Sequence, residues 1–335
     1  MTRQRSHNPE QRRIVAELCR QFPKAGSRTL ARRLNDEHPT LFPTIERARA
    51  GVRYHRGNKG RKSKVYADRR GTARPNRQAG ELPPLPESLA RPLNPYLLDT
   101  RRLLILADIH VPYHDNQAIE AALAYGEKFK PDTVLINGDG IDFEAISRFQ
   151  KDPRGPTTKQ ELQMYGGLLA HISARFPRTK KKKRIGNHEE RWEHMLWLRP
   201  DLLDLTEFLW EKWACIAEND FEVIRGRRPI MAGQLPIWHG HEKGKQLSAP
   251  VNQARGMFLK YLCSALESHG HRQSEHTERT ADDHHYSCWS TGCLCGLWPE
   301  YAKVNKWSHG FATVVVAKDG SYGVELKRII DGKVY

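Results

Sequence analysis

Hydrophobic positions in the first part of the chain repeat with the spacing of an amphipathic helix. Three such stretches are present, covering residues 9–22, 27–38 and 45–56. Each begins at a residue type that caps helices well, namely Asn8, Ser27 and Thr44. Gly57 follows the third stretch and favours its termination. The pattern therefore predicts a small all-α unit over residues 1–57.

Continuous apolar runs replace the helical spacing from residue 101 onward, as is typical of buried strands. The first three runs alternate with two helical patterns, which predicts an α/β sheet with parallel members. The expected strands are 102–107, 133–137 and 181–185, and the expected helices are 116–129 and 159–175. Further strand patterns cover 235–238, 262–266, 286–289, 311–317 and 322–330, with Asp319-Gly320 suited to a hairpin turn.

Residues 58–100 carry neither pattern. Their first half is rich in Arg, Lys and Gly, and the stretch from Leu82 to Pro95 is rich in Pro. We therefore expect a helical domain at 1–57, a linker at 58–100 and an α/β domain at 101–335.

Positive charge is concentrated at the start of the chain. The net charge is +16, yet residues 1–80 hold 21 Lys and Arg against 6 Asp and Glu, while residues 81–335 hold 34 against 33. This asymmetry favours a polyanionic partner, most often nucleic acid. A basic solubilising tail is the alternative.

The third predicted helix places Arg49, Arg53 and Arg56 on one stripe. Three short helices, the last one basic, are similar to a helix-turn-helix unit, which places a recognition helix in a DNA groove. We therefore expect these arginines to contact DNA. A small helical bundle with a solvated arginine face is the alternative.

Cellular location follows from two features of the sequence. The chain has no run of 18 apolar residues, and its first residues lack the apolar segment of a secretory signal, so we expect no membrane partner. The six cysteines are scattered, which favours free thiols in the cytoplasm. Cys288, Cys293 and Cys295 lie close together, but their spacing differs from the paired C-x2-C of zinc sites.

Residues of the types that bind metals follow the predicted strands where these end. They are Asp108, His110, Asp139, Asn187, His239, His269 and His271. Strand ends line the ligand crevice of an α/β sheet. Carboxylate, imidazole and amide oxygen together suit Mn²⁺ first, with Fe²⁺, Zn²⁺ or Ni²⁺ as alternatives, and about seven ligands suit two divalent ions. Each residue alone is more typical of a turn, a helix cap or a core histidine.

The order of these clusters resembles that of the calcineurin-like metallophosphoesterases. That family's motifs are D-x-H, G-D-x-x-D, G-N-H-[DE], H-G and G-H-x-H. Here they are Asp108-x-His110, Gly138-Asp139-x-x-Asp142, Gly186-Asn187-His188-Glu189, His239-Gly240 and Ser268-His269-Gly270-His271, with Ser268 replacing a Gly. The chain also resembles phage-encoded members with an N-terminal helix-turn-helix. The resemblance implies a sandwich of mixed α/β sheets flanked by helices, in a bacterial or phage-infected cell.

The resemblance also implies a role for each residue. One metal would be bound by Asp108, His110 and His271, the other by Asn187, His239 and His269, and Asp139 would bridge the two. His188 would stabilise the transition state or protonate the leaving oxygen, and Asp142 would orient His188. A hydroxide bridging the ions would attack phosphorus in line.

Several residues leave alternatives open. In the phosphoprotein phosphatases of this superfamily an Arg stands where this chain has Phe143, which weakens a phosphoprotein substrate. Arg191 either reaches phosphate in its place or lies on a helix surface.

His241 repeats the spacing of a ligand pair, but we expect it not to bind metal. The basic run 180–184 is interpreted as a possible exposed edge. Trp192, Trp197, Trp210 and Trp213 suit core packing better than base stacking.

Three functions remain. The first is a two-metal phosphodiesterase, nuclease or end-processing phosphatase acting on DNA. The second is a phosphomonoesterase or phosphoprotein phosphatase with a basic targeting arm. The third is a non-catalytic, DNA-binding phage accessory protein.

Overall fold

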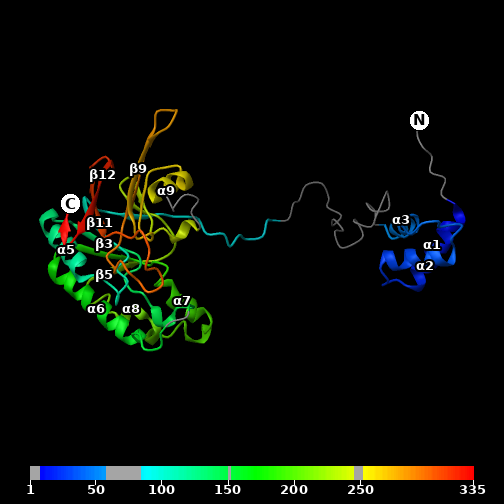
Figure 1. The fold of residues 1–335 in the computed structure, drawn as a ribbon, viewed down its shortest axis with the longest axis horizontal. Coiled ribbons are helices and arrows are strands. Elements are labelled where there is room, and N and C mark those ends of the chain that lie inside the picture. The colour runs from blue at the N-terminus through cyan, green and yellow to red at the C-terminus, as the bar shows by residue number, and fades with distance from the viewer. Residues whose placement is uncertain (1–7, 58–83, 150–151, 245–251) are drawn as a thin grey trace. The chain divides into compact units, whose positions relative to one another are not determined.

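The computed structural model describes residues 8–57, 84–149, 152–244 and 252–335. Contacts among residues separate the chain into two compact units, with the boundary between Ala90 and Arg91 (Figure 1). We call them the helical unit and the sandwich unit. The basic half of the predicted linker falls on residues 58–83, outside the described part. No helix in the described part is both long enough and apolar enough to cross a membrane.

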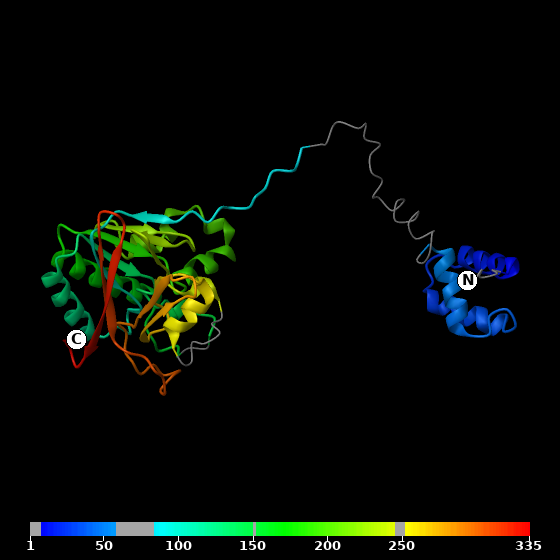
Figure 2. The same cartoon turned by 90° about the horizontal axis from the view of Figure 1, so that it is seen from above.

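The helical unit contains α1 (Pro9–Gln21), α2 (Ser27–Glu37) and α3 (Ile45–His55), visible in Figure 2. The side chain of Asn8 caps α1, and that of Thr44 caps α3. The predicted cap at Ser27 is wrong by one residue, because extended Gly26 is the N-cap and makes no side-chain hydrogen bond. The helices enclose a small core of Val15, Leu18, Cys19, Leu30, Ala31, Leu34, Phe42, Ala48 and Val52.

A seven-stranded mixed sheet forms one layer of the sandwich unit, in the order β13-β12-β11-β2-β3-β4-β5. Its strands are β2 (Arg102–Leu106), β3 (Thr133–Asn137), β4 (Lys180–Arg184), β5 (Phe221–Ile224), β11 (Gly310–Val316), β12 (Tyr322–Ile330) and β13 (Lys333–Val334). Strands β2 to β5 are parallel, β11 pairs antiparallel with β2, and β12 pairs antiparallel with β11. The parallel strands β2 and β3 are buried on both faces, which explains their continuous apolar sequences.

A six-stranded mixed sheet forms the second layer, in the order β1-β6-β7-β8-β10-β9. Its strands are β1 (Tyr96–Leu98), β6 (Ile230–Ala232), β7 (Leu235–Ile237), β8 (Ala265–Glu267), β9 (Gln273–Arg279) and β10 (His285–Thr291). An apolar layer between the sheets includes Leu103, Leu135, Ile237, Leu266 and Val314. Alternate residues of β2 and β3 thus face the other sheet, as strand geometry requires.

Helices cover the outer faces of the two sheets. α5 (Asn116–Phe129) and α6 (Thr158–Arg175) pack on the seven-stranded sheet, and α9 (Gln253–Tyr261) packs on the six-stranded sheet (Figure 1). Among the described residues, the remaining helices are α7 (Glu190–Trp197), α8 (Trp210–Trp213) and the 3-10 turns Glu144–Ile146, Pro200–Leu202, Thr206–Phe208 and His241–Lys243. The prediction of mixed α/β sheets flanked by helices is confirmed.

The basic strand β4 corrects one prediction. Its run 180–184 does not lie at an exposed edge, because β4 pairs with β3 on one side and β5 on the other. The buried cations have partners: Lys183 pairs with Glu189, and Arg184 pairs with Glu242. These partners offset the cost of burying charge in the middle of a sheet.

Further differences concern short elements, and β5, β6 and β13 were not predicted. β1 lies inside the stretch expected to be linker, where it pairs with β6. The strand expected at 262–266 is β8, which begins only at Ala265, since Leu262 adopts a left-handed conformation that ends α9. The strand β9 was not predicted, because its sequence, Gln273–Arg279, contains no apolar residue.

Candidate metal centre

Both sheets deliver metal-binding side chains to one end of the sandwich unit. Parallel strands β2, β3 and β4 end just before Asp108, Asp139 and Asn187, and β7 and β8 end just before His239 and His269. Their carboxyl ends therefore meet at a single crevice, as expected for an α/β sheet.

Asp139 lies at the middle of the cluster. Its Oδ2 atom is 3.1 Å from His239 Nε2, 3.8 Å from His110 Nε2 and 3.9 Å from His269 Nδ1. The same oxygen is 4.0 Å from His188 Nε2. One carboxylate oxygen thus faces imidazole nitrogens from four separate segments.

Two smaller groups lie beside Asp139. His271 Nε2 is 3.4 Å from Asp108 Oδ1 and 3.0 Å from His110 Nε2. On the other side, Asn187 Oδ1 is 3.1 Å from His239 Nε2. Asp108, His110 and His271 therefore form one group, Asp139, His239 and His269 form another, and Asn187 lies beside His239.

The backbone at this cluster is strained. The left-handed region, unfavourable for residues other than glycine, is occupied by Asp108 (φ 51°), His110 (φ 52°), Asp139 (φ 47°), His269 (φ 62°) and His271 (φ 54°). Five of the seven expected ligands are therefore held in a costly conformation, as happens at sites that the surrounding structure fixes for function.

Two buried polar atoms of the cluster have no hydrogen-bond partner. Asp108 Oδ1 and His269 Nδ1 are buried and make no hydrogen bond. Burial raises the pKa of Asp139, but the charges of His239 and His188 outweigh it and hold that pKa well below its usual range. Asp139 in turn raises the pKa of His239 to about 10 against the effect of burial. Divalent ions would take the place of these protons, so the residues fit metals.

Two buried carboxylates outside the ligand set fix the turns that carry the ligands. Glu189 accepts hydrogen bonds from the backbone N–H groups of Asp139 (3.1 Å), Gly140 (2.8 Å) and Gly186 (2.8 Å). Its partner Lys183 lies 2.5 Å away, and both side chains are fully buried. This pair therefore ties the β3 turn to the β4 turn.

Glu242 fixes the turn after β7 by accepting backbone hydrogen bonds in the same way. It accepts from the N–H groups of His239 (3.3 Å) and Gly240 (2.7 Å), and Arg184 Nη2 lies 2.9 Å from it. The basic residues of β4 thus anchor carboxylates that position ligand turns from both sheets. The sequence had no signal for these roles beyond the unusual run of cations.

His188 and its neighbours form a second functional group at the crevice. His188 Nδ1 lies 2.8 Å from the carbonyl oxygen of Asp142 and 3.4 Å from its carboxylate, whose other oxygen is 3.0 Å from His110 Nδ1. Burial raises the pKa of Asp142, but the two histidines outweigh it and lower that pKa. Asp142 therefore orients both rings.

Arg191 points into the crevice. Its Nη1 donates to the Asp142 carboxylate at 3.1 Å, and its Nη2 lies 3.2 Å from His188 Nε2. The helix-surface alternative for Arg191 is therefore wrong. Phe143 is fully buried against Trp192 and Trp210, so its position contributes no group to the crevice.

His271 has two further neighbours that the sequence did not reveal. Cys295 Sγ lies 3.7 Å from His271 Nδ1, and the ring of Trp307 packs at 4.1 Å between centroids. Cys293 is also close, whereas Cys288 lies elsewhere and donates to the carbonyl of Cys263.

His241 lies beside the cluster, with its ring 5.3 Å from that of His239, and its exclusion from the ligand set stays a prediction. Its Nε2 lies 3.2 Å from Glu190, and its ring is 6.3 Å from that of His269. Among the tryptophans, Trp210 is buried and Trp192 packs on the core, while Trp197 and Trp213 are exposed. The predicted core packing is therefore found for Trp192 and Trp210 but not for Trp197 and Trp213.

The three arginines of the predicted stripe, Arg49 and Arg53 in α3 and Arg56 at its C-cap, differ in their surroundings. Arg56 donates to the carbonyls of Ala25 (2.6 Å), Phe22 (3.1 Å) and Pro23 (3.3 Å), so it closes the end of α1 and supports the helical unit itself. Arg49 lies 3.5 Å from Glu46. DNA contact by Arg49 and Arg53 stays a prediction, and Arg56 has a structural role that the stripe pattern did not indicate.

Comparisons with known proteins give distant likenesses. No family model matches the chain. It is 22% identical over 185 residues to the "Gene 54 protein" of Mycobacterium phage L5, covering 52% of this chain and 70% of that protein. Among solved structures, it is 14% identical to Vps29 from Entamoeba histolytica (70% of this chain, 96% of that one, TM-score 0.35). It is also 14% identical to the phosphoesterase Yfce from E. coli (67% and 98%, TM-score 0.30). At these scores the likenesses do not decide the function.

Proposed function

We propose that the chain is a metal-dependent phosphoesterase that hydrolyses phosphodiester bonds in nucleic acid. The observation that carries the proposal is the gathering of seven donor side chains, Asp139 among them, in one crevice where Asp108 Oδ1 and His269 Nδ1 are buried without a hydrogen bond. The donor set suits two divalent ions, Mn²⁺ first, with Fe²⁺, Zn²⁺ or Ni²⁺ as alternatives.

Two groups of residues would hold the ions. They are Asp108, His110 and His271 on one side and Asn187, His239 and His269 on the other, with Asp139 between them. When bound, such ions supply an activated water and neutralise charge on a phosphoryl group.

The protein's own residues would handle the proton and the phosphate. Asp142 holds His188 through Nδ1, so a protonated His188 would donate from Nε2 to the phosphate or to the leaving oxygen once the phosphate takes the place of Arg191 at that nitrogen. Arg191 reaches the same nitrogen, so its guanidinium is placed to neutralise the phosphate. The buried pairs Lys183–Glu189 and Arg184–Glu242 fix the ligand turns, so that little reorganisation is needed during the reaction.

The charge distribution supports nucleic acid as the substrate. Residues 1–80 carry a net charge of +15, from 21 Lys and Arg against 6 Asp and Glu, so the first part of the chain would attract a polyanion. We propose that α3 contacts DNA through Arg49 and Arg53 and so brings phosphodiesters to the sandwich unit. Phe143, buried in the core, supplies no phosphate-binding group of the kind expected in a phosphoprotein phosphatase.

The test is hydrolysis of bis(p-nitrophenyl) phosphate and of DNA by the full chain with Mn²⁺. We expect both to be cleaved, with cleavage abolished in Asp139→Asn and retained in Asp319→Asn, which changes an exposed turn carboxylate. Metal-dependent activity on phosphopeptides with none on diesters or DNA would overturn the nucleic-acid part. Tightly bound ions without any turnover would favour a non-catalytic DNA-binding protein.

A further inference from the structure

A loop over residues 296–308 stands beside the candidate centre and contains no regular helix or strand. Hydrogen bonds inside the loop hold its shape. Asn305 Nδ2 donates to the carbonyls of Leu297 (2.7 Å) and Ala302 (2.8 Å), and Asn305 Oδ1 accepts from the N–H of Trp307 (2.8 Å). One side chain therefore joins the two limbs, as in compact surface loops that carry function.

The base of the loop is fastened to the centre. The N–H of Ser308 donates to the carbonyl of His271 at 2.9 Å, and the N–H of Gly296 donates to the carbonyl of Tyr113 at 2.7 Å. Trp307 packs on the His271 ring, and the Tyr301 ring lies 6.2 Å from that of Trp307. A line of aromatic rings thus runs outward from an expected metal ligand.

The tip of the loop exposes large side chains. Trp298 is 69% exposed, Tyr301 is 79% exposed and Val304 is 97% exposed. Such a concentration of exposed apolar surface on one short loop is typical of a contact surface.

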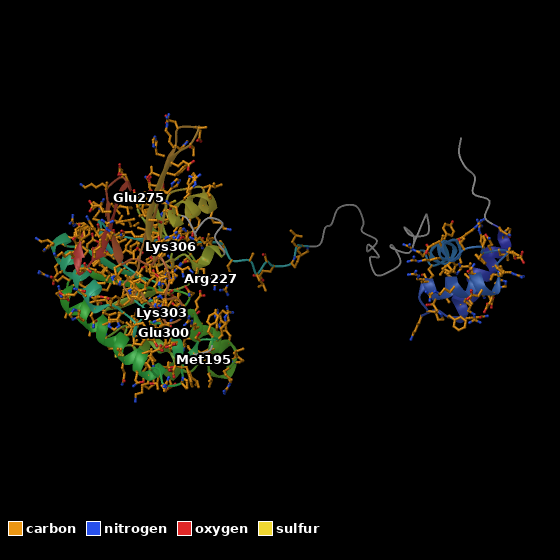
Figure 3. The ribbon with its side chains drawn as sticks, in the orientation of Figure 1. Met195, Arg227, Glu275, Glu300, Lys303 and Lys306 are labelled. Carbon is orange, nitrogen blue, oxygen red and sulfur yellow. The ribbon has the colours of Figure 1, made fainter. Side chains whose placement is uncertain are left out.

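The same loop carries positive charge. Lys303 and Lys306 are exposed, and Figure 3 labels both of them, with Glu300 beside Lys303. Lys303 lies 2.6 Å from Glu300, which is itself highly exposed. An ion pair so open to water is weak, so a phosphate can compete with Glu300 for the lysine.

We propose that this loop is a stacking platform for the unpaired bases of a single nucleic-acid strand whose backbone enters the centre. The inference rests on the proposed function and narrows its substrate class from nucleic acid in general to single strands or frayed ends. Flat aromatic faces suit every base, and lysines suit the backbone between bases. A ligand of this chemistry is both planar and anionic, which matches Trp298 and Tyr301 next to Lys303 and Lys306.

The experiment measures cleavage of a single-stranded oligonucleotide of about six nucleotides by the full chain with Mn²⁺, a length within the site size of one strand-binding fold. In the double variant Trp298→Ala/Tyr301→Ala, we expect KM for this oligonucleotide to rise about tenfold or more while kcat changes less than about twofold. Trp298→Phe/Tyr301→Phe keeps both rings and should restore most of the affinity. Asn305→Ala keeps the rings but removes the hydrogen bonds that hold the loop, and should raise KM in the same direction.

A matched control removes exposed aromatic residues from other elements. Trp213 and Tyr335 are 54% and 62% exposed, and Trp213→Ala/Tyr335→Ala should leave KM for the oligonucleotide unchanged. If the wild type cleaves diesters but the loop variant has an unaltered KM, the platform is excluded while the proposed function stands. If the variant instead loses self-association on size exclusion, the loop contacts a second copy and the platform is again excluded.

Failure of the proposed function has a different signature, namely absence of diester cleavage by the wild type. In that case fluorescence anisotropy with a labelled phosphorothioate oligonucleotide still tests the platform. Weaker binding by Trp298→Ala/Tyr301→Ala than by the control would support it, and equal binding would overturn it.

Discussion

The ammonium group of Lys183 lies 2.5 Å from the carboxylate of Glu189, and neither side chain has any exposure to solvent. Glu189 also accepts backbone hydrogen bonds from Asp139 and Gly140. The pair therefore connects the middle of the seven-stranded sheet with the turn at the heart of the candidate centre. Its position makes stability and metal binding depend on the same ion pair.

Replacing Lys183 with Met should be strongly destabilising. The substitution would leave the Glu189 carboxylate buried without a cation, and breaking one partner of a buried ion pair costs about 3–5 kcal/mol. Urea denaturation monitored by fluorescence measures the loss. The double variant Lys183→Met/Glu189→Gln should lose less free energy of unfolding than the sum of the losses in the two single variants, because no uncompensated charge is left buried.

Lys182 provides the matched control for this prediction. It occupies the same strand but pairs with Glu222, whose side chain is 55% exposed. Lys182→Met should therefore cost less than about 1 kcal/mol. Equal losses at Lys182 and Lys183 would contradict a special role for the Lys183–Glu189 pair.

Cys295 should set the orientation of His271. Its sulfur lies 3.7 Å from Nδ1 of that ring, while Nε2 faces Asp108. Cys295→Ala removes this partner, and loss of a group that orients a ligand typically weakens metal binding about 10–100-fold. Competition with a chelating dye measures the affinity. Cys288→Ala removes an equally buried thiol that does not contact His271, and it should leave metal affinity unchanged.

Glu161 makes folding stability depend on pH. Burial raises the pKa of this carboxyl to about 7, and its Oε2 has no hydrogen-bond partner. The folded chain therefore binds this proton more tightly than the unfolded chain, so this contribution to stability falls as pH rises from about 4.5 to about 7.

Glu161→Gln mimics the protonated form. Its Tm should exceed that of the wild type at pH 8, and the difference should shrink at pH 5, as differential scanning calorimetry would record. A difference that does not change with pH would contradict this account.

Arg53 in α3 and Arg56 at its C-cap should separate DNA binding from folding. Arg53→Ala should weaken DNA binding. The slope of log K against log salt concentration should fall by about 0.9 for each phosphate that the variant no longer neutralises. The stability of the helical unit should not change. Arg56→Ala should instead destabilise that unit by about 1.5–3 kcal/mol, since it removes charged hydrogen bonds to Ala25 and Phe22. Titration of DNA at two salt concentrations, together with thermal unfolding by circular dichroism, tests both. If neither variant loses DNA binding, α3 does not contact DNA.

Much of the fold followed from sequence because its central elements have strong local patterns. The helix at 116–129 and the strands at 133–137 and 322–330 have the bounds predicted from their spacing. Strand β9 could not be predicted, because its polar sequence becomes a strand only by pairing with β10. The burial of β4 could not be predicted either, since it results from pairing with β3 and β5, and Arg184 finds its partner Glu242 far away in the sequence.

The candidate centre likewise combines residues that the sequence predicted with contacts that it did not. The donor residues were recognisable because each follows a strand and belongs to a short motif, and the structure brings them together around Asp139. The interactions of Glu242, Cys295 and Trp307 depend on tertiary packing, and nothing in their local sequence marks them. Sequence therefore predicted which atoms meet, but not what holds them in place.

The measurement that tests the account most directly is the number of metal ions bound per chain. Full-length protein equilibrated with Mn²⁺ and then desalted should retain two ions per chain by inductively coupled plasma mass spectrometry, and Asp139→Asn should retain fewer. Less than one ion per chain in the wild type, or a count that Asp139→Asn does not change, would contradict the shared metal centre.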